Sequence, residues 1–349
     1  MTASSGAHVA VVGCGAVSSI YYAPALARLV QDGRVRRVTA FDPHAERARA
    51  FANLAGAELV ETSFEDLLTR GADLLIVASP PTLHAAQSIA AMEAGMDVLC
   101  EKPVATSAAE ATAMIDAATR TVRRLFAGQV RRQFPATRAI ADVVHSGLLG
   151  DIREVTSFEG GPFAWPIAGP SYFSRASSGG GVLQDIGTHC LDLLQWWFGQ
   201  PRGVHYEDDA FGGVEANCLA RLDYGSFQAT MRLSRDWARP NVYRIVGSKG
   251  WLTWSVNEAL NFDFHLAGNT HSQVLMAAVP GSSPDDFQQA FIQQILGAMP
   301  AGTGGTELQS VLPTISLIER CYTDRVAMQL PWLAPEEAAR AVALPRVPR

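Results

Sequence analysis

The chain has 349 residues, of which 48% are apolar and 18% charged, and its formal net charge is −6. A chain of this length is longer than the chains that usually fold around a single hydrophobic core, so we expect two domains. The acidic balance, without any basic run, argues against binding of nucleic acid. No apolar run approaches the roughly 18 residues of a membrane span. The N-terminus lacks the basic segment and apolar core of a signal peptide, so we expect a cytoplasmic protein.

The cysteines are scattered, odd in number and without CxxC spacing. They are Cys14, Cys100, Cys190, Cys218 and Cys321. Disulfide frameworks and zinc sites need paired or clustered cysteines, so this pattern predicts free thiols in a reducing compartment and no metal site.

Strand-like and helix-like segments alternate through the first third of the chain. Short apolar, β-branched runs typical of buried strands cover 8–13, 35–41, 73–79 and 96–103. Helical patterns cover residues near 17–31, 43–56, 82–95 and 107–120. The last begins with a capping box of Ser107 and Glu110. Strands that alternate with helices predict a doubly wound parallel sheet.

A glycine-rich loop connects the first strand to the first helix. Its sequence, from Gly13 to Ser18, is GCGAVS. Glycines at this place permit a tight turn and let the backbone of Gly13, Gly15, Ala16 and Val17 approach a pyrophosphate, which then lies at the helix N-terminus. Ser18 stands where the dinucleotide-binding pattern has glycine or alanine, and its hydroxyl could also face a phosphate.

Asp42 ends the second strand. A carboxylate there accepts hydrogen bonds from adenosine ribose hydroxyls and repels a 2′-phosphate, so NAD is favoured over NADP. Arg47, a turn further on, is the nearest cation that follows in the chain. The alternative role for Asp42 is a helix N-cap before Pro43.

Glu101, Lys102 and Pro103 follow the strand that ends at Cys100. This is the carboxyl edge of the expected sheet, where open α/β folds bind ligands. Lys102 can there reach a substrate hydroxyl or the nicotinamide ribose, and the alternative is a surface lysine after a turn.

Four motifs in fixed order resemble those of the Gfo/Idh/MocA oxidoreductases, the family of glucose–fructose oxidoreductase and inositol dehydrogenase. They are GCG after the first strand, SPPTLH (79–84), EKP (101–103) and GGGVLQDIGTH (179–189). The resemblance implies a Rossmann domain over 1–129 and an α+β domain with a large, mostly antiparallel sheet over 130–349. The substrate would lie between them, and the second sheet would pair subunits into a homodimer or homotetramer.

The resemblance also implies a role for each matched residue. Lys102 would contact the nicotinamide ribose and the reacting oxygen, and the Lys102–Pro103 peptide bond would be cis. His189 would be the general acid/base, and Asp185 would orient the substrate or tune the imidazole. The expected cofactor-binding residues are Gly13, Gly15, Ala16, Val17, Asp42, Ser79, Pro80, His84, Glu101 and Lys102.

The helix that carries Asp185 and His189 has a polar stripe beside its apolar face. At 100° per residue, the apolar face holds Leu183, Ile186, Cys190, Leu194 and Trp197. The second stripe holds Asp185, His189, Asp192 and Trp196, without the lysine, glutamate or arginine usual on a solvated face. The three preceding glycines would let the backbone approach a ligand. The alternative is an ordinary amphipathic helix with a structural Asp–His pair.

The segment 160–178 is rich in aromatic residues, proline and serine and has little periodicity, so we expect a loop over the substrate. Its candidate lining residues are Trp165, Tyr172, Phe173 and Arg175. Aromatic faces stack on sugar rings, which suits a polyol. The expected substrate-binding residues are Arg132, Trp165, Tyr172, Asp185 and His189, with Arg131 as the alternative to Arg132.

The rest of the chain indicates strands and two closing helices. A helix should end near Gly147, strands should cover 151–159, 203–207, 215–233 and 241–255, with a hairpin turn at 223–226, and helices should cover 285–299 and 306–325.

Together these features predict an oxidoreductase that transfers a hydride between a nicotinamide cofactor and a secondary hydroxyl or ketone of a sugar, aminosugar or cyclitol. Two alternatives are an NAD-dependent glycosidase with transient oxidation and a catalytically silent NAD-binding regulator. Four acidic residues would suit a cationic aminosugar or simply a solvated surface: Glu159, Glu207, Asp208 and Asp209.

Overall fold

A computed structural model describes residues 6–57, 59–60, 62–167, 170–256, 258–268, 272–275, 284–297 and 308–329. The chain forms two compact units. The first comprises Met1–Val130, Pro166–Pro170 and Pro280–Leu312, and the second comprises Arg131–Trp165, Ser171–Val279 and Pro313–Arg349. The first change of unit lies between Val130 and Arg131, one residue after the expected boundary at 129/130. The segment Pro280–Leu312, which we expected in the second domain, belongs to the first unit.

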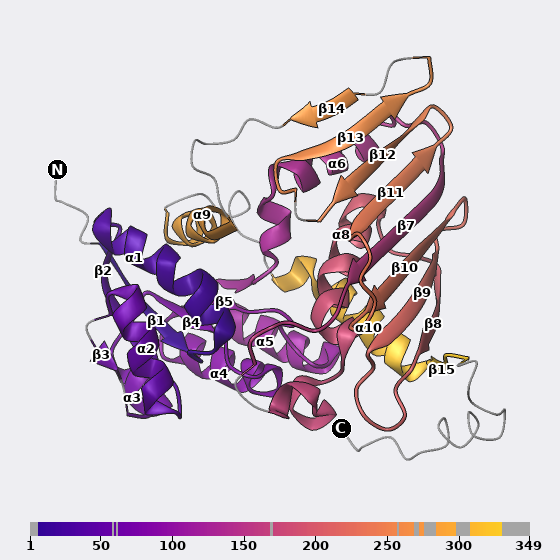
Figure 1. Cartoon of the computed structure of the whole chain (residues 1–349). Coiled ribbons are helices and arrows are strands. Elements are labelled where there is room, and N and C mark those ends of the chain that lie inside the picture. The colour runs from indigo at the N-terminus through magenta and orange to yellow at the C-terminus, as the bar shows by residue number, and fades with distance from the viewer. Residues whose placement is uncertain are drawn as a thin grey trace. The chain divides into compact units, whose positions relative to one another are not determined.

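The first unit is built on a parallel sheet, as predicted (Figure 1). Its described strands are β1 (Ala7–Val12), β2 (Val35–Phe41), β3 (Leu59–Val60), β4 (Leu74–Val77), β5 (Asp97–Cys100) and β6 (Leu125–Ala127). They are ordered β3-β2-β1-β4-β5-β6, which is the order of a doubly wound dinucleotide-binding fold. The chain order reverses at β1, so ligand-binding loops are expected after β1 and its neighbour β4.

Helices cover both faces of this sheet, because right-handed crossovers that run in opposite directions from β1 place their helices on opposite sides. The described helices are η1 (Ser18–Tyr22), α1 (Ala23–Gln31), α2 (Ala45–Ala55), α3 (Phe64–Thr69), α4 (Pro81–Glu93), α5 (Ala108–Thr121), α9 (Pro284–Leu296) and η5 (Leu308–Ser310). The α5 cap is present: the Ser107 hydroxyl accepts from Glu110 N at 3.2 Å. Phe291, Ile292 and Ile295 of α9 are buried in the core with α1, so this helix completes the first unit.

The second unit is built on a mixed, mostly antiparallel sheet, which confirms the expected fold class. Its described strands are β7 (Ile152–Gly160), β8 (Gly203–Asp208), β9 (Asn217–Asp223), β10 (Gln228–Ser234), β11 (Val242–Gly247), β12 (Gly250–Ser255), β13 (Asn261–Leu266), β14 (Ser272–Leu275) and β15 (Val326–Ala327). The order is β14-β13-β12-β11-β7-β10-β9-β8-β15, and only β7–β10 and β8–β15 are parallel among the described pairs. The predicted hairpin turn lies between β9 and β10.

Helices pack on one face of this second sheet. They are α6 (Pro135–His145), η4 (Leu183–Gly187), α8 (Thr188–Phe198) and α10 (Leu312–Thr323), whose apolar side chains share the core with the strands. The remaining described helical segments are the short helix α7 (Arg175–Ser178) and the 3-10 turns η2 (Val130–Gln133) and η3 (Pro170–Phe173). Trp197 anchors α8, since its ring meets those of Tyr243 and Trp254 edge-on, at 5.6 and 6.1 Å between centroids. Its indole N–H donates to Thr137 O at 3.1 Å. The helix that carries Asp185 and His189 is therefore fixed by its buried end.

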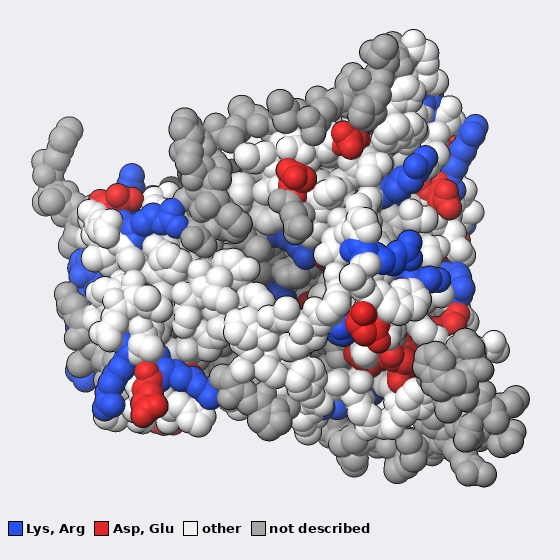
Figure 2. All heavy atoms as spheres, in the orientation of Figure 1, with Lys and Arg blue, Asp and Glu red and all other residues white. Residues whose placement is uncertain are grey.

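The distribution of charged side chains and the state of the cysteines are as the composition of the chain led us to expect. On the face drawn in Figure 2, basic and acidic side chains are interspersed among uncharged ones. All five cysteines are free, as predicted, and all five are buried. Within the described part of the chain, no helix has the length and apolarity to cross a bilayer.

Candidate active site

Three loops gather at the carboxyl edge of the first sheet, because β1, β4 and β5 are neighbours in it. The loops begin at Gly13, Ala78 and Glu101. Gly13 has a φ of +88°, and a Cβ built on it would lie 2.5 Å from both Ala78 C and Ser79 N. Only glycine fits so close to the second loop.

The start of the first helix has the geometry expected for a pyrophosphate site. A Cβ built on Gly15 would meet no described atom within 4 Å, so its backbone borders open space. The helical conformation begins at Ala16, so the amides of Gly15, Ala16 and Val17 lie at the helix N-terminus. Amides at this position have no hydrogen-bonding carbonyl within the helix. The Ser18 hydroxyl donates to Gly13 O at 2.6 Å and is fully buried. It therefore braces the loop, and the suggestion that it faces a phosphate is wrong.

Asp42 joins the glycine loop to the end of β2. Its Oδ2 accepts from Cys14 N at 2.9 Å, and its Oδ1 accepts from His44 N at 2.8 Å. The N-cap residue of α2 is His44, so Asp42 is not the helix cap considered above. A carboxylate oxygen has more than one lone pair, so both oxygens retain acceptor capacity toward ribose hydroxyls.

Glu101 braces the loop that holds Lys102. The Tyr22 hydroxyl donates to Glu101 Oε1 at 2.6 Å, and Lys102 N donates to Oε2 at 3.0 Å. Burial raises the pKa of the Glu101 carboxyl, against the effect of the Tyr22 hydrogen bond and the Lys102 charge. The Lys102–Pro103 peptide bond is cis, as the family resemblance implied. Lys102 itself is half-buried.

His84 connects the loop that begins at Ala78 to the loop that begins at Glu101. Its Nε2 lies 2.8 Å from Ser79 O and its Nδ1 lies 2.9 Å from Pro103 O. The side chain is buried, and this burial lowers its pKa, while the carbonyls of Ser79 and Pro103 act in the opposite direction. The Ser79 hydroxyl donates to Gln87 Oε1 at 2.5 Å. His84, predicted to bind the cofactor, thus contacts the backbone of the loops.

Asp185 and His189 lie one helical turn apart in the second unit, and both are half-buried. Asp185 belongs to the π-helical turn η4, and His189 is the second residue of α8. The wider π turn invalidates the spacing of 100° per residue over 183–187, and such turns recur at functional sites. Asp192, expected on the same stripe, is instead buried.

Arg235 is a charged residue of this region that sequence reasoning missed. Its guanidinium pairs with Asp185 and donates to the Tyr172 hydroxyl at 2.6 Å, and that hydroxyl donates to Asp185. Arg235 also lies over the ring of Phe163, 5.0 Å from its centroid. It follows β10 in a segment without a motif, so only the folded chain reveals the pairing. Burial lowers the pKa of Arg235, and Tyr172 acts in the opposite direction.

The three glycines before η4 are explained by packing. Gly179 has a φ of +80° and caps α7. A Cβ on Gly180 would lie 2.0 Å from the Tyr322 hydroxyl oxygen, and one on Gly181 would lie 2.1 Å from Glu215 O. At Gly180 and Gly181 the expectation that the glycines admit a ligand is therefore wrong, since protein atoms occupy the space.

Arg131 and Arg132 both form ion pairs within the second unit. Arg131 pairs with the buried Glu159 at 2.7 Å. Arg132 binds both oxygens of Asp192, at 2.6 and 2.7 Å, and stacks on Trp196 at 5.7 Å. Both guanidinium groups therefore stabilise the surroundings of the helix that carries His189.

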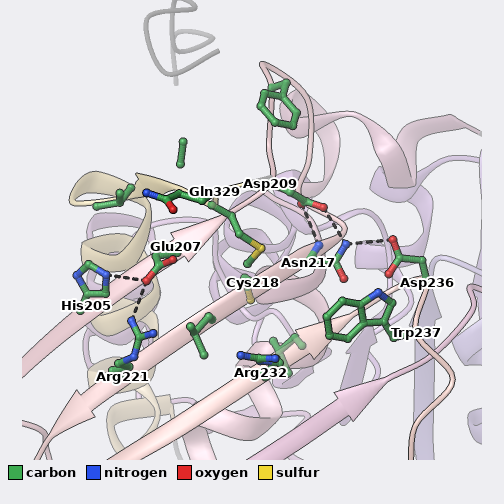
Figure 3. A pocket seen from close by; sticks show the side chains of 16 residues that line it. His205, Glu207, Asp209, Asn217, Cys218, Arg221, Arg232, Asp236, Trp237 and Gln329 are labelled. Atoms are coloured by element: carbon green, nitrogen blue, oxygen red, sulfur yellow. Dashed lines mark hydrogen bonds and ion pairs between the residues drawn. The ribbon is translucent and has the colours of Figure 1, made fainter. Parts of the chain in front are cut away.

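The four acidic residues that suggested a cationic substrate all have partners. Glu159 pairs with Arg131, Glu207 with Arg221 and His205, and Asp208 with Arg325. Asp209 accepts from the backbone of Ala216 and Asn217. Glu207 and Asp209 line a pocket of about 870 Å³ on β8, β9 and β10 (Figure 3). No residue predicted for the active site lines this pocket. No cluster of metal-binding side chains occurs among the described residues.

The first unit thus has the loops of a dinucleotide-binding domain, and the second has Asp185 and His189 one turn apart on one helix. Residues 7–129 match the model of the oxidoreductase family with an NAD-binding Rossmann fold, and residues 137–253 match the GFO/IDH/MocA C-terminal domain. The chain belongs to the Gfo/Idh/MocA family of oxidoreductases.

Relatives and solved structures agree with this assignment. A D-xylose 1-dehydrogenase (NADP(+)) of Haloferax volcanii is 30% identical over 81% of this chain and 89% of its own. A dTDP-3,4-didehydro-2,6-dideoxy-alpha-D-glucose 3-reductase of Streptomyces violaceoruber is 31% identical over 60% of this chain and 61% of its own. The fold matches an inositol dehydrogenase homolog from Azotobacter vinelandii, complexed with NAD+, with a TM-score of 0.81 at 21% identity, covering 92% and 95% of the two chains. The matches span about three fifths of the first curated relatives.

Proposed function

We propose that this protein is a nicotinamide-dependent dehydrogenase or ketoreductase that acts on a secondary hydroxyl or ketone of a neutral sugar or cyclitol. The observation that carries the proposal is the placement of His189 one turn after Asp185, whose charge is balanced by Arg235. A balanced pair presents donors and acceptors without a net charge, which suits hydroxyl groups better than an ammonium group.

The proposed roles follow from the chemistry of each side chain. When bound, the nicotinamide accepts or supplies the hydride. His189 takes the hydroxyl proton during oxidation and returns it during reduction, since imidazole changes protonation near neutral pH. The Lys102 ammonium stabilises negative charge on the reacting oxygen. Asp185, Tyr172 and Arg235 orient the substrate.

The composition of the chain adds support for Lys102. Among 28 basic residues, only Lys102 and the exposed Lys249 are lysines. An ammonium is a compact charge with three donors, whereas a guanidinium is a planar fork, so the two are not interchangeable beside a single reacting oxygen. This protein uses arginine almost everywhere and has lysine at the proposed catalytic position.

We further propose NAD as the preferred cofactor. Gly13, Gly15, Ala16 and Val17 would contact the pyrophosphate, and Ser79, Pro80 and Lys102 would flank the nicotinamide side. The Asp42 carboxylate would accept from the ribose hydroxyls and disfavour a 2′-phosphate. Since the Haloferax relative is an NADP(+) enzyme, the assay below compares NAD with NADP directly.

The deciding experiment follows NADH absorbance with myo-inositol, D-xylose and their derivatives, each with NAD and NADP. We expect net NADH formation with NAD and at least a hundredfold lower kcat in His189→Ala and Lys102→Ala, within the usual range for acid/base catalysis. NADH affinity should change less than threefold in His189→Ala. His205→Ala and Lys249→Ala are the matched controls, because both residues are exposed. Full activity of both active-site variants would refute the roles, and turnover without net NADH would indicate a glycosidase.

A further inference from the structure

Glu215 lies at the start of the helix that carries Asp185 and His189. Its Oε1 accepts from the amides of Gly181 and Leu183, both at 3.0 Å, and its carbonyl accepts from Val182 N at 3.0 Å. The side chain is 1% exposed. These are the amides at a helix N-terminus that need a partner from outside the helix. One residue from a distant loop therefore holds three consecutive amides just before Asp185.

The same carboxylate is connected to the loop that carries Tyr172. The Tyr322 hydroxyl of α10 donates to Glu215 Oε1 at 2.7 Å. The Arg175 guanidinium of α7 lies over the Tyr322 ring, 4.8 Å from its centroid. Gly180 and Gly181 pass so close to Tyr322 and Glu215 that neither has room for a Cβ. The helix start and the loop are thus packed against one buried pair.

We propose that Glu215 is a positioning residue for the substrate-binding half of the site, which sets the placement of Asp185 and His189 through the start of their helix. The inference rests on the proposed function of His189. Glu215 is separated from Asp185 by only two peptide units through its bond to Leu183 N, so a displaced carboxylate displaces the π turn directly. A buried charge-assisted cap of this kind is also stronger than a neutral one.

The protonation of Glu215 gives this arrangement a pH dependence. Burial raises the pKa of Glu215 to about 7, and the charge of Asp208 acts in the same direction. The titratable or charged groups around it are Asp208 and Tyr206 on β8, Cys218 on β9, Tyr322 on α10, Arg325, which pairs with Asp208, and Arg175 over Tyr322. Oε2 has no hydrogen-bonding partner among the described residues. Above pH 7 the carboxylate is the stronger acceptor for the two amides and the phenol.

The test uses the full-length protein and does not depend on a known substrate. The ring signals of His189 are assigned with His189→Ala and titrated by NMR in the wild type, Glu215→Gln, Glu215→Ala and Tyr322→Phe. Amide exchange over 181–187 is measured alongside from pH 6 to 8. Glu207→Gln is the matched control, because Glu207 is an ion-paired glutamate on the neighbouring strand β8.

We expect Glu215→Ala to shift the His189 titration midpoint by at least 0.5 pH unit and to accelerate exchange over 181–187 at least tenfold. Tyr322→Phe should shift the midpoint less. Glu215→Gln keeps an acceptor oxygen, so His189 should retain its wild-type titration midpoint within 0.2 pH unit. Because glutamine does not ionise, this variant should lack the change in amide exchange over 181–187 that ionisation of Glu215 produces near pH 7 in the wild type. If Glu215→Ala does not fold, an unchanged midpoint in Tyr322→Phe together with wild-type pH dependence in Glu215→Gln overturns the inference.

The outcomes separate this inference from the proposed function. An unaltered His189 titration in every variant, with an inactive His189→Ala enzyme, overturns only the role of Glu215. A fully active His189→Ala enzyme overturns the proposed function, whatever the titrations show. A variant that loses thermal stability while His189 titrates normally assigns Glu215 to folding alone.

Discussion

The candidate site of the first unit consists of three loops that follow adjacent strands, whereas that of the second unit consists of side chains from distant segments. In the first unit, Gly13, Ser79 and Lys102 share one sheet edge because β1, β4 and β5 are neighbours. In the second, Asp185 meets Arg235 across 50 residues and Glu215 meets Tyr322 across 107.

The difference shows two ways of placing functional groups. Parallel strands bring their carboxyl ends to one edge, so a repeated strand–loop–helix unit suffices to assemble a ligand-binding edge. A helix laid on a mixed sheet has no such rule, and its polar groups need buried partners of opposite charge or complementary hydrogen bonding. The first unit therefore depends on backbone conformation and the second on side-chain pairs.

The largest expected effect comes from a pair of glycine substitutions, one in each unit. Gly181→Ala places a Cβ 2.1 Å from Glu215 O, so it should lower the free energy of unfolding by about 3 kcal/mol, as overpacking does. Gly15→Ala meets no described atom within 4 Å and should change stability by less than about 1 kcal/mol. Urea denaturation of both variants measures the difference.

NADH affinity, followed by fluorescence, provides the opposite contrast for the same pair. Gly15→Ala should weaken NADH binding at least tenfold, because its Cβ enters the space proposed for the pyrophosphate, and Gly181→Ala should leave it unchanged. Equal stability of the two variants would contradict the packing explanation for Gly181.

The second effect is the pH dependence contributed by Glu215. Burial raises its pKa in the folded protein to about 7, from the ordinary 4.5 of a glutamate that applies in the unfolded chain, so the folded state binds the proton more tightly. Its contribution to stability is present below pH 4.5 and is lost as the pH rises through 7, by about 3 kcal/mol at pH 7, where the group is half ionised, at 1.4 kcal/mol per pKa unit. Calorimetry across this range should show wild-type stability falling relative to Glu215→Gln. Parallel curves would contradict the raised pKa.

Sequence patterns predicted where the loops of the first unit lie in its sheet, but not the side chains that pack around Asp185 and His189 in the second unit. The glycine loop, Asp42 and Lys102 lie at the expected places because strand periodicity and strand order determine their positions. Arg235 and Glu215 were missed, since neither lies in a motif and each acts through a partner far along the chain. The role of Gly180 and Gly181 was predicted wrongly, because no local pattern indicates that Tyr322 and Glu215 pack on them. Helix α9 was predicted correctly as a helix, but its membership in the first unit is a tertiary property.

A third, smaller effect concerns the Asp185–Arg235 pair. Removal of either partner leaves a charge in a site where the side chains are only 24% and 18% exposed, so Arg235→Met should cost about 2 kcal/mol of stability. A double-mutant cycle with Asp185→Asn should give a coupling energy of about 1 to 2 kcal/mol. The exposed pair Arg120–Glu93 of the first unit is the control and should give less than about 0.5 kcal/mol. A coupling as weak as that of the control would remove Arg235 from the support of Asp185.

The smallest effect tests the hydroxyl of Ser18, a side-chain brace within the glycine loop. Ser18→Ala removes a buried hydrogen bond to Gly13 O and should cost about 1 kcal/mol of stability, because the carbonyl then lacks this donor. NADH affinity should stay within twofold of the wild type, since the hydroxyl points into the loop and not toward a ligand. Ser18→Gly should cost more than Ser18→Ala, because a glycine at this helical position also loses backbone entropy. A tenfold loss of NADH affinity in Ser18→Ala would instead mean that the hydroxyl turns to the pyrophosphate on binding, and the first half of the site would then also depend on a mobile side chain.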